Sequence, residues 1–255
     1  MTKTIAFAGK GGTGKTTTCG LLIDYLCKTG KGPVLAVDAD ANSNLNEVLG
    51  IEVEQTLGEV REVVARSSMD DTIIPAGVSK QEYAEWEFSK ALHESDDYDL
   101  LVMGRTQGEG CYCYVNGVLK AQIEKYAKNY PYMVVDNEAG LEHISRGVLP
   151  SIDILLLVSD CSRRGVQAAG RLNAMISELS LNPDMVGLII NRAPQPELDE
   201  GIKEEIKLQN LNLVGIVPAD ETIYRYDAEG LPTTSVPQDN PVRLAVNKIM
   251  AEIGL

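Results

Sequence analysis

The sequence predicts a single α/β domain, residues 1–255, with a mostly parallel sheet of seven or eight strands and helices on both faces. Short apolar runs rich in Val, Ile and Leu recur along the chain, separated by segments with a helical pattern. These runs lack apolar–polar alternation, as is typical of strands buried on both faces of a parallel sheet. A chain of 255 residues is long enough for one large core, and it contains no internal repeat or linker.

The expected elements follow in alternation along the chain. We expect strands over residues 4–8, 33–37, 99–103, 132–135, 154–158, 186–190 and 213–217. We expect helices over residues 15–28, 81–93, 115–128, 164–179, 197–208 and 241–253. The polar, acidic segment 50–80 shows only short helical patterns and remains unassigned.

Composition limits the function classes that the chain can serve. Its 37 acidic and 23 basic residues give a formal net charge of −14, which argues against a general binder of nucleic acid or of anionic membranes. No leader segment and no apolar run of about 18 residues is present, so we expect a cytoplasmic protein. The five cysteines are an odd number and are expected to be thiols rather than a disulfide framework.

A glycine-rich motif follows the first expected strand almost at once. Residues 9–16 read G-K-G-G-T-G-K-T, the P-loop pattern, between a strand and a helix. Its glycines let successive N–H groups point at one phosphate, and the helix dipole adds positive charge. Lys15 is expected to reach the β- and γ-phosphates of ATP, or the β-phosphate of ADP, and the Thr16 hydroxyl is expected to bind Mg²⁺. The predicted nucleotide-binding residues here are Gly9, Gly11, Gly12, Thr13, Gly14, Lys15, Thr16 and Thr17.

Three aspartates follow at the ends of later strands. Asp38 and Asp40 end the second expected strand, and Asp136 ends the fourth, in a hydrophobic-run-then-aspartate pattern typical of a Walker B element. Carboxyl ends of parallel strands face the ligand-binding edge, so one carboxylate can orient a water and others can support Mg²⁺. A single such aspartate is as often a helix N-cap. Three in this order after a P-loop indicate hydrolysis.

The second lysine of the loop, Lys10, makes the motif resemble that of the deviant Walker A P-loop ATPases, such as nitrogenase iron protein, the arsenite pump ATPase and the cell-division-site positioning ATPase. The resemblance implies a homodimer with ATP between the subunits, in which Lys10 crosses to the partner's nucleotide. It also implies that Asp40 activates the attacking water, while Asp38 and Asp136 support Mg²⁺. Lys10, Lys15 and Asp40 are therefore the expected catalytic residues.

Two late segments also match this family. Ile189-Ile190-Asn191-Arg192 and Val217-Pro218-Ala219-Asp220 each close an expected strand. The resemblance implies that Asn191, Pro218 and Asp220 hold the adenine base, for which an amide that donates and accepts is well suited. Ordinary turn chemistry after a strand is the alternative for each of them.

A cysteine pair, Cys111 and Cys113, lies in the glycine-containing segment G-E-G-C-Y-C-Y. Two thiolates do not complete a tetrahedral metal site, but the same pair from each subunit of a twofold dimer supplies four sulfurs. With this pair, the whole chain resembles the nickel-insertion maturation ATPases of carbon monoxide dehydrogenase and acetyl-CoA synthase. The resemblance implies Ni²⁺ as cargo, Zn²⁺ as a possible substitute, and the apo form of either enzyme as client.

Three alternatives stay open at this point. The two cysteines can be buried structural thiols, which are common in cores. Four interfacial thiolates can instead hold an iron–sulfur cluster, as in an electron donor of the nitrogenase iron protein type. A positioning ATPase at a membrane is disfavoured, because the last helix carries only two basic residues, Arg243 and Lys248.

Overall fold

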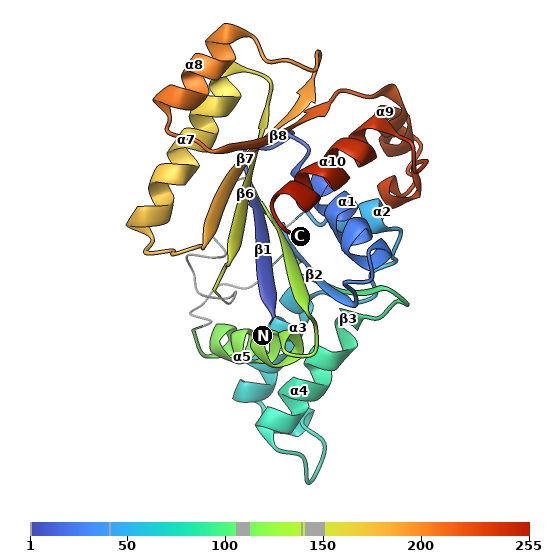
Figure 1. The fold of residues 1–255 in the computed structure, drawn as a ribbon. Helices are drawn as coiled ribbons and strands as arrows, with labels where there is room; N and C mark the ends of the chain where they lie inside the picture. The colour runs from blue at the N-terminus through green and yellow to red at the C-terminus, as the bar shows by residue number, and fades with distance from the viewer. Residues whose placement is uncertain (1, 41, 106–112, 139, 141–150) are drawn as a thin grey trace.

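A computed structural model describes residues 2–40, 42–105, 113–138, 140 and 151–255. These residues form an eight-stranded sheet flanked by helices, as predicted (Figure 1). The strands are β1 Lys3–Ala8, β2 Val34–Ala39, β3 Leu92–His93, β4 Tyr98–Val102, β5 Tyr132–Asn137, β6 Ile154–Asp160, β7 Met185–Ala193 and β8 Leu213–Pro218. The helices are α1 Lys15–Lys28, α2 Leu45–Leu49, α3 Leu57–Met69, α4 Lys80–Lys90, α5 Cys113–Ala127, α7 Arg163–Glu178, α8 Glu200–Leu208, α9 Glu221–Ala228 and α10 Pro241–Glu252, with 3₁₀ turns η1 Asp71–Ile73 and η2 Thr233–Ser235.

The sheet has the order β3-β4-β2-β5-β1-β6-β7-β8. All neighbouring strands run parallel except β3 and β4. The expected helix 81–93 is therefore too long: α4 ends at Lys90, and Leu92 and His93 pair antiparallel with Leu101 and Leu100. A two-residue edge strand contributes too short an apolar run to be separated from the end of the preceding helix.

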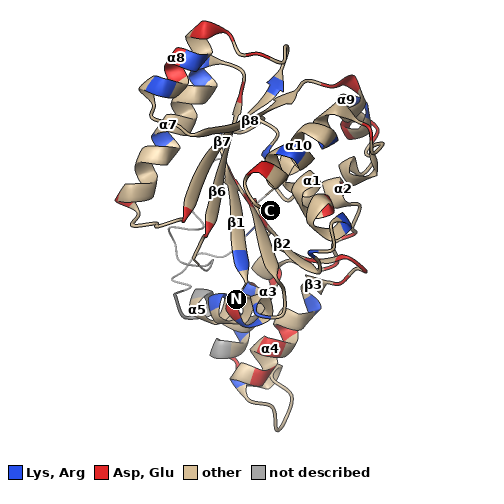
Figure 2. Ribbon diagram, viewed as in Figure 1, with Lys and Arg blue, Asp and Glu red and all other residues tan. Residues whose placement is uncertain are grey.

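The core lies in two layers, one on each face of the sheet, because successive strand residues point to opposite faces. On one face, Ala6 and Ala8 of β1 pack in a cluster with residues of α3, α4, α5, α7 and α8. On the other face, Ile5 and Phe7 of β1 pack with α1, α2 and α10. In Figure 2, the positions of Lys, Arg, Asp and Glu along the ribbon lie mostly on the helices and loops, with few on the central strands.

Capping residues explain several boundaries that the apolar pattern missed. In the unassigned segment 50–80, α3 begins with a capping box in which the Thr56 hydroxyl accepts from the Glu59 N–H and the Glu59 carboxylate accepts from the Thr56 N–H. The expected helix 197–208 begins only at Glu200; Asp199 is its N-cap residue, although the Asp199 side chain makes no capping hydrogen bond. The short helix α9, which we did not predict, begins at the N-cap Asp220.

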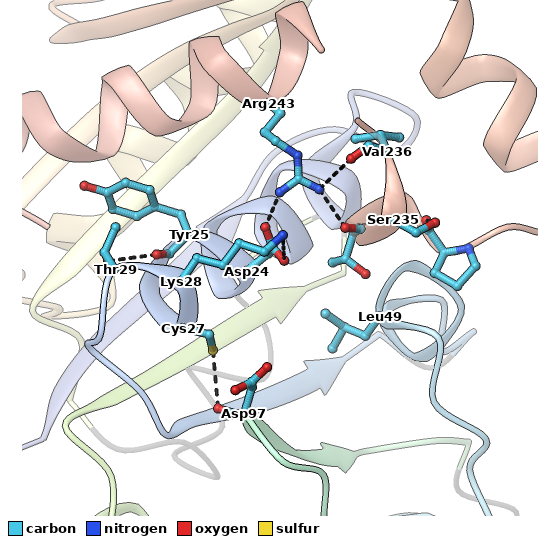
Figure 3. A network of polar contacts seen from close by, with 12 residues as sticks. Asp24, Tyr25, Cys27, Lys28, Thr29, Leu49, Asp97, Ser235, Val236 and Arg243 are labelled. Carbon is cyan, nitrogen blue, oxygen red and sulfur yellow. Dashed lines mark hydrogen bonds and ion pairs between the residues drawn. The ribbon is translucent and has the colours of Figure 1, made fainter. Parts of the chain in front are cut away.

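The last helix is tied to the P-loop helix by a buried arginine (Figure 3). Arg243 of α10 has a side chain only 1% exposed and forms an ion pair with Asp24 of α1. Its Nη2 donates to the carbonyls of Thr234, at 2.6 Å, and Val236, at 3.1 Å. One side chain thus joins α10, α1 and the η2 segment, which also borders the site described next.

Candidate functional site

The P-loop connects β1 to α1 at the carboxyl edge of the sheet. Two of its glycines have backbone angles and surroundings that exclude any side chain. Gly9 has φ +154°, and a Cβ there would lie 2.2 Å from the carbonyl oxygen of Val158 in β6. Gly14 has φ +86°, and a Cβ there would lie 2.2 Å from the side-chain nitrogen of Asn191 in β7. Strands β6 and β7 therefore pack directly against the backbone of the P-loop at these two glycines.

A pocket of about 360 Å³ opens in front of this loop. Lys15, although charged, is buried within it, and its Nζ donates to the Lys10 carbonyl at 3.4 Å. Burial lowers the pKa of Lys15, while Asp136, Asp40 and Glu138 act in the opposite direction. The predicted nucleotide-binding residues that line the pocket are Gly11, Gly12, Gly14, Lys15, Thr16 and Thr17.

Asp38 and Asp136 lie side by side behind the pocket, since β2 and β5 pair with these two residues in register. Both side chains are buried, and Asp38 accepts hydrogen bonds from the N–H groups of Asp40 and Leu45, each at 3.0 Å. Burial raises the pKa of Asp38 to about 6. Burial is also the main cause that raises the pKa of Asp136 to about 7. A hydrogen bond from the Thr16 hydroxyl acts in the opposite direction and lowers this pKa.

The carboxylate of Asp136 is not fully satisfied within the protein. Its Oδ1 is buried and has no hydrogen-bond partner among the described residues. A buried carboxylate oxygen without a partner, beside a threonine hydroxyl, fits a Mg²⁺ site. No group of three or more His, Cys, Asp and Glu in the described part of the chain could hold a metal by itself.

Asp40, the expected water-activating residue, lines the same pocket. Its Oδ1 accepts from the Asn42 N–H at 2.8 Å, and its carbonyl accepts from the Ser43 N–H at 3.1 Å. The Asn42 side chain in turn accepts from Arg105 at 2.7 Å. The turn after β2 thus holds the Asp40 carboxylate at the pocket wall.

Asn191 and Arg192, at the end of β7, contact the P-loop backbone. The Asn191 amide donates to the Thr13 carbonyl at 2.8 Å, and its oxygen accepts from the Arg192 N–H at 2.9 Å. The Arg192 guanidinium donates to the Gly12 carbonyl at 3.0 Å. The adenine-binding role of Asn191 stays a prediction, and its visible contact is with the loop.

The other two expected adenine contacts lie close together at the neighbouring strand. Pro218 ends β8, and the Asp220 carboxylate caps α9 by accepting from the Thr222 and Ile223 N–H groups. Asp220 also accepts from the Asn240 side chain at 2.9 Å. These are the contacts of an N-cap residue, and neither Pro218 nor Asp220 is among the residues that line the pocket.

Lys10 is exposed at the loop, and its side chain has no ion-pair partner within the described ranges. Cys111 lies outside the described residues; Cys113 is the first residue of α5, and its side chain lies outside them too. The three described cysteines are free thiols, Cys19, Cys27 and Cys161. Burial raises the pKa of each, to about 12 for Cys27.

Sequence reasoning missed one wall of the pocket. The missed lining residues come from α2 and its N-cap, from β7, and from the stretch between the end of α9 and the start of η2: Asn44, Glu47, Val48, Arg192, Asp227, Gly230, Leu231 and Thr233. Most belong to no motif, because segments outside the P-loop and outside the strand-end motifs supply them. Only Arg192 among these missed residues has a sequence signal: it directly follows Asn191, a predicted site residue, at the end of a buried strand.

No helix within the described residues is both long and apolar enough to cross a membrane. Residues 4–233 match the family model described as the CobQ/CobB/MinD/ParA nucleotide binding domain. An uncharacterised ATP-binding protein of Methanocaldococcus jannaschii is 41% identical over 249 residues, covering 98% of this chain and 97% of the relative.

More distant relatives carry more specific names. The carbon monoxide dehydrogenase accessory protein CooC of Rhodospirillum rubrum is 27% identical over 250 residues, covering 89% of this chain and 88% of CooC. The septum site-determining protein MinD of Pyrococcus horikoshii, solved with Mg-ADP, has the same fold, with a TM-score of 0.71 and 23% identity over 100% of this chain and 96% of MinD. With its P-loop and this family match, the chain belongs to the CobQ/CobB/MinD/ParA family of nucleotide-binding P-loop proteins.

Proposed function

We propose that the chain hydrolyses Mg-ATP as a homodimer and uses the conformational change to deliver nickel to an apo-metalloenzyme. The observation that carries the ATPase part is the unpartnered, buried Oδ1 of Asp136, whose carboxylate accepts a hydrogen bond from Thr16 beside the pocket that Thr16 and Lys15 line. Asp136 and Thr16 would hold Mg²⁺ there, and the ion would neutralise negative charge on a bound phosphate. The relative named for ATP binding supports the choice of nucleotide.

Each residue has a distinct task in this proposal. Lys15 and the P-loop N–H groups hold the phosphates, and Thr16, Asp38 and Asp136 would hold Mg²⁺, which neutralises phosphate charge. Asp40 orients the attacking water from the pocket wall. The exposed Lys10 supplies its charge to the nucleotide of the partner subunit, where P-loop ATPases otherwise use an arginine.

The nickel part depends on Cys111 and Cys113. Two thiolates from each subunit give the four soft ligands of a closed tetrahedral site, and such a site ties metal binding to dimerisation. Similarity to a protein named as a carbon monoxide dehydrogenase accessory factor supports this class of client. The client in the proposal is apo carbon monoxide dehydrogenase or acetyl-CoA synthase, and Zn²⁺ can occupy the same site.

The ATPase part is tested with two lysine variants. Lys15→Ala removes the phosphate ligand of the same subunit, so it should weaken binding of ATP itself. Lys10→Ala should leave ATP binding largely intact but abolish hydrolysis that depends on dimerisation. Nucleotide titration and phosphate release, measured at several protein concentrations, separate the two effects. Equal binding defects in both variants would contradict a role for Lys10 across the interface.

The nickel part is tested by metal content after anaerobic purification. The proposal predicts about half an equivalent of nickel per subunit, because one site serves two chains. The Cys111→Ser/Cys113→Ser variant should bind none, whereas the control Cys161→Ser should bind as the unmodified protein does. Normal nickel binding by the double variant would refute the proposal, and a brown protein containing iron and sulfide would favour the cluster carrier.

A further inference from the structure

The end of β7 has an irregular backbone that directs two consecutive side chains at the P-loop. In a regular strand, neighbouring side chains point to opposite faces. Here one extra residue lies in β7 opposite β8 between Ile190 and Ala193, and Arg192 has φ +54°. A bulge of this kind commonly redirects a side chain beside a functional site. As a result, Asn191 reaches the Thr13 carbonyl and Arg192 reaches the Gly12 carbonyl.

A left-handed backbone is costly for a residue other than glycine. The fold retains it at Arg192, where the guanidinium lies against the phosphate-binding loop. A guanidinium has five N–H donors. Only its Nη1 has an acceptor among the described residues, and the side chain is exposed toward the pocket that it lines.

The charge balance of this pocket singles out the same residue. Among the described residues that line it, the only cations are Lys15 and Arg192, and they face three carboxylates, Asp40, Glu47 and Asp227. A phosphate chain would add further negative charge. Burial lowers the pKa of Lys15, whereas an arginine stays protonated and can bind two phosphate oxygens at once.

We propose that Arg192 is a phosphate-binding residue, supplied in cis by β7, which contacts the phosphate chain of the nucleotide with the guanidinium donors that Gly12 leaves free. This proposal rests on the proposed nucleotide-binding function and adds a second cation to Lys15 within the same subunit. It is separate from the role of Lys10, which concerns the partner's nucleotide. Arg192 would therefore act in the monomer as well as in the dimer.

The test compares two substitutions that separate the positive charge of the guanidinium from its ability to donate a hydrogen bond to Gly12. Arg192→Gln keeps an amide donor for the Gly12 carbonyl but loses the charge, and Arg192→Lys keeps the charge. Arg225→Gln, an exposed arginine on α9 that does not line the pocket, is the matched control for net charge. The affinity for Mg-ADP is measured by titration, and thermal unfolding without nucleotide reports on folding.

Loss of a charge-assisted contact predicts a Kd for ADP raised about tenfold or more in Arg192→Gln. Arg192→Lys should recover most of the affinity, and Arg225→Gln should bind ADP as the unmodified protein does. A purely structural clamp on Gly12 would leave Arg192→Gln within about twofold of the unmodified protein, and that result would overturn the proposal. Failure of the unmodified protein to bind ADP would instead refute the proposed function.

Arginine modification provides a second measurement that needs no variant. Phenylglyoxal reacts with accessible guanidinium groups, and peptide mass spectrometry reports the extent at each site. Mg-ADP should slow the modification of Arg192, while adenosine, which lacks phosphate, should not, and Arg225 should react equally in all samples. Modification of Arg192 at an unchanged rate under saturating Mg-ADP would overturn the proposal.

Discussion

Replacing Arg243 by methionine should destabilise the fold strongly, because this arginine is the buried junction of α10, α1 and η2 (Figure 3). Removal of one partner from a buried ion pair costs about 3–5 kcal/mol. Asp24 is 13% exposed and keeps a second cation, Lys28, at 2.9 Å, so the lower end applies. A loss of about 3 kcal/mol lowers the Tm of a chain of this size by about 6–12 °C.

Thermal unfolding followed by circular dichroism at pH 7.5, without nucleotide, measures this effect. The control is Lys248→Met on the same helix, where an exposed lysine lies 3.8 Å from Glu252. An exposed pair of this kind contributes at most about 1 kcal/mol, so the control should change Tm by about 4 °C or less. If Arg243→Met lowers Tm no more than the control does, the junction does not stabilise the fold as we argue.

Two further predictions concern ionisable groups. Burial raises the pKa of Asp38 to about 6 and of Asp136 to about 7, from an ordinary value of 3.8. Between these values, the two carboxyl groups keep their protons in the folded chain but have lost them in the unfolded chain. The free energy of unfolding without nucleotide should therefore fall as pH rises from about 4 to 7, and Asp136→Asn should flatten that fall. A rise over this range in denaturant titrations would contradict the prediction. Alkylation by iodoacetamide at pH 8 should be slow at Cys27, because its pKa is raised to about 12. Alkylation should be fast at Cys111 and Cys113, and bound nickel should protect this pair. Peptide mapping that finds Cys27 among the fast sites would refute this prediction.

The sheet could be predicted well from sequence because its strands are buried on both faces and therefore consist of continuous apolar residues. The edge strand β3 escaped prediction, since two residues carry no periodic signal and their pairing with β4 is decided by tertiary contact. Helix α3 escaped for another reason. Its segment is polar overall, although the capping pair Thr56 and Glu59 was present in the sequence and could have marked its start.

In the candidate site, too, some features could be predicted from the sequence and others could not. The P-loop could be predicted because its chemistry demands fixed residue types at fixed spacing. Asp38 and Asp136 could be predicted at the ligand-binding edge of the sheet, but the structure was needed to show that β2 and β5 are neighbours and pair at these two residues. The contact of Arg192 with Gly12 could not be predicted, because it depends on a bulge in β7 and on the left-handed backbone of Arg192. No local sequence pattern indicates either feature. The wall formed by the segment after α9 depends on long-range packing, which one sequence does not encode locally.

Native mass spectrometry of the Asp40→Ala variant with saturating Mg-ATP and one equivalent of Ni²⁺ tests the central claim most directly. Loss of the water-orienting carboxylate should trap the ATP-bound state, so its composition can be weighed before hydrolysis. The account predicts a species of two chains, two ATP molecules and one nickel ion. A single chain that binds ATP and its own nickel ion under the same conditions would contradict it.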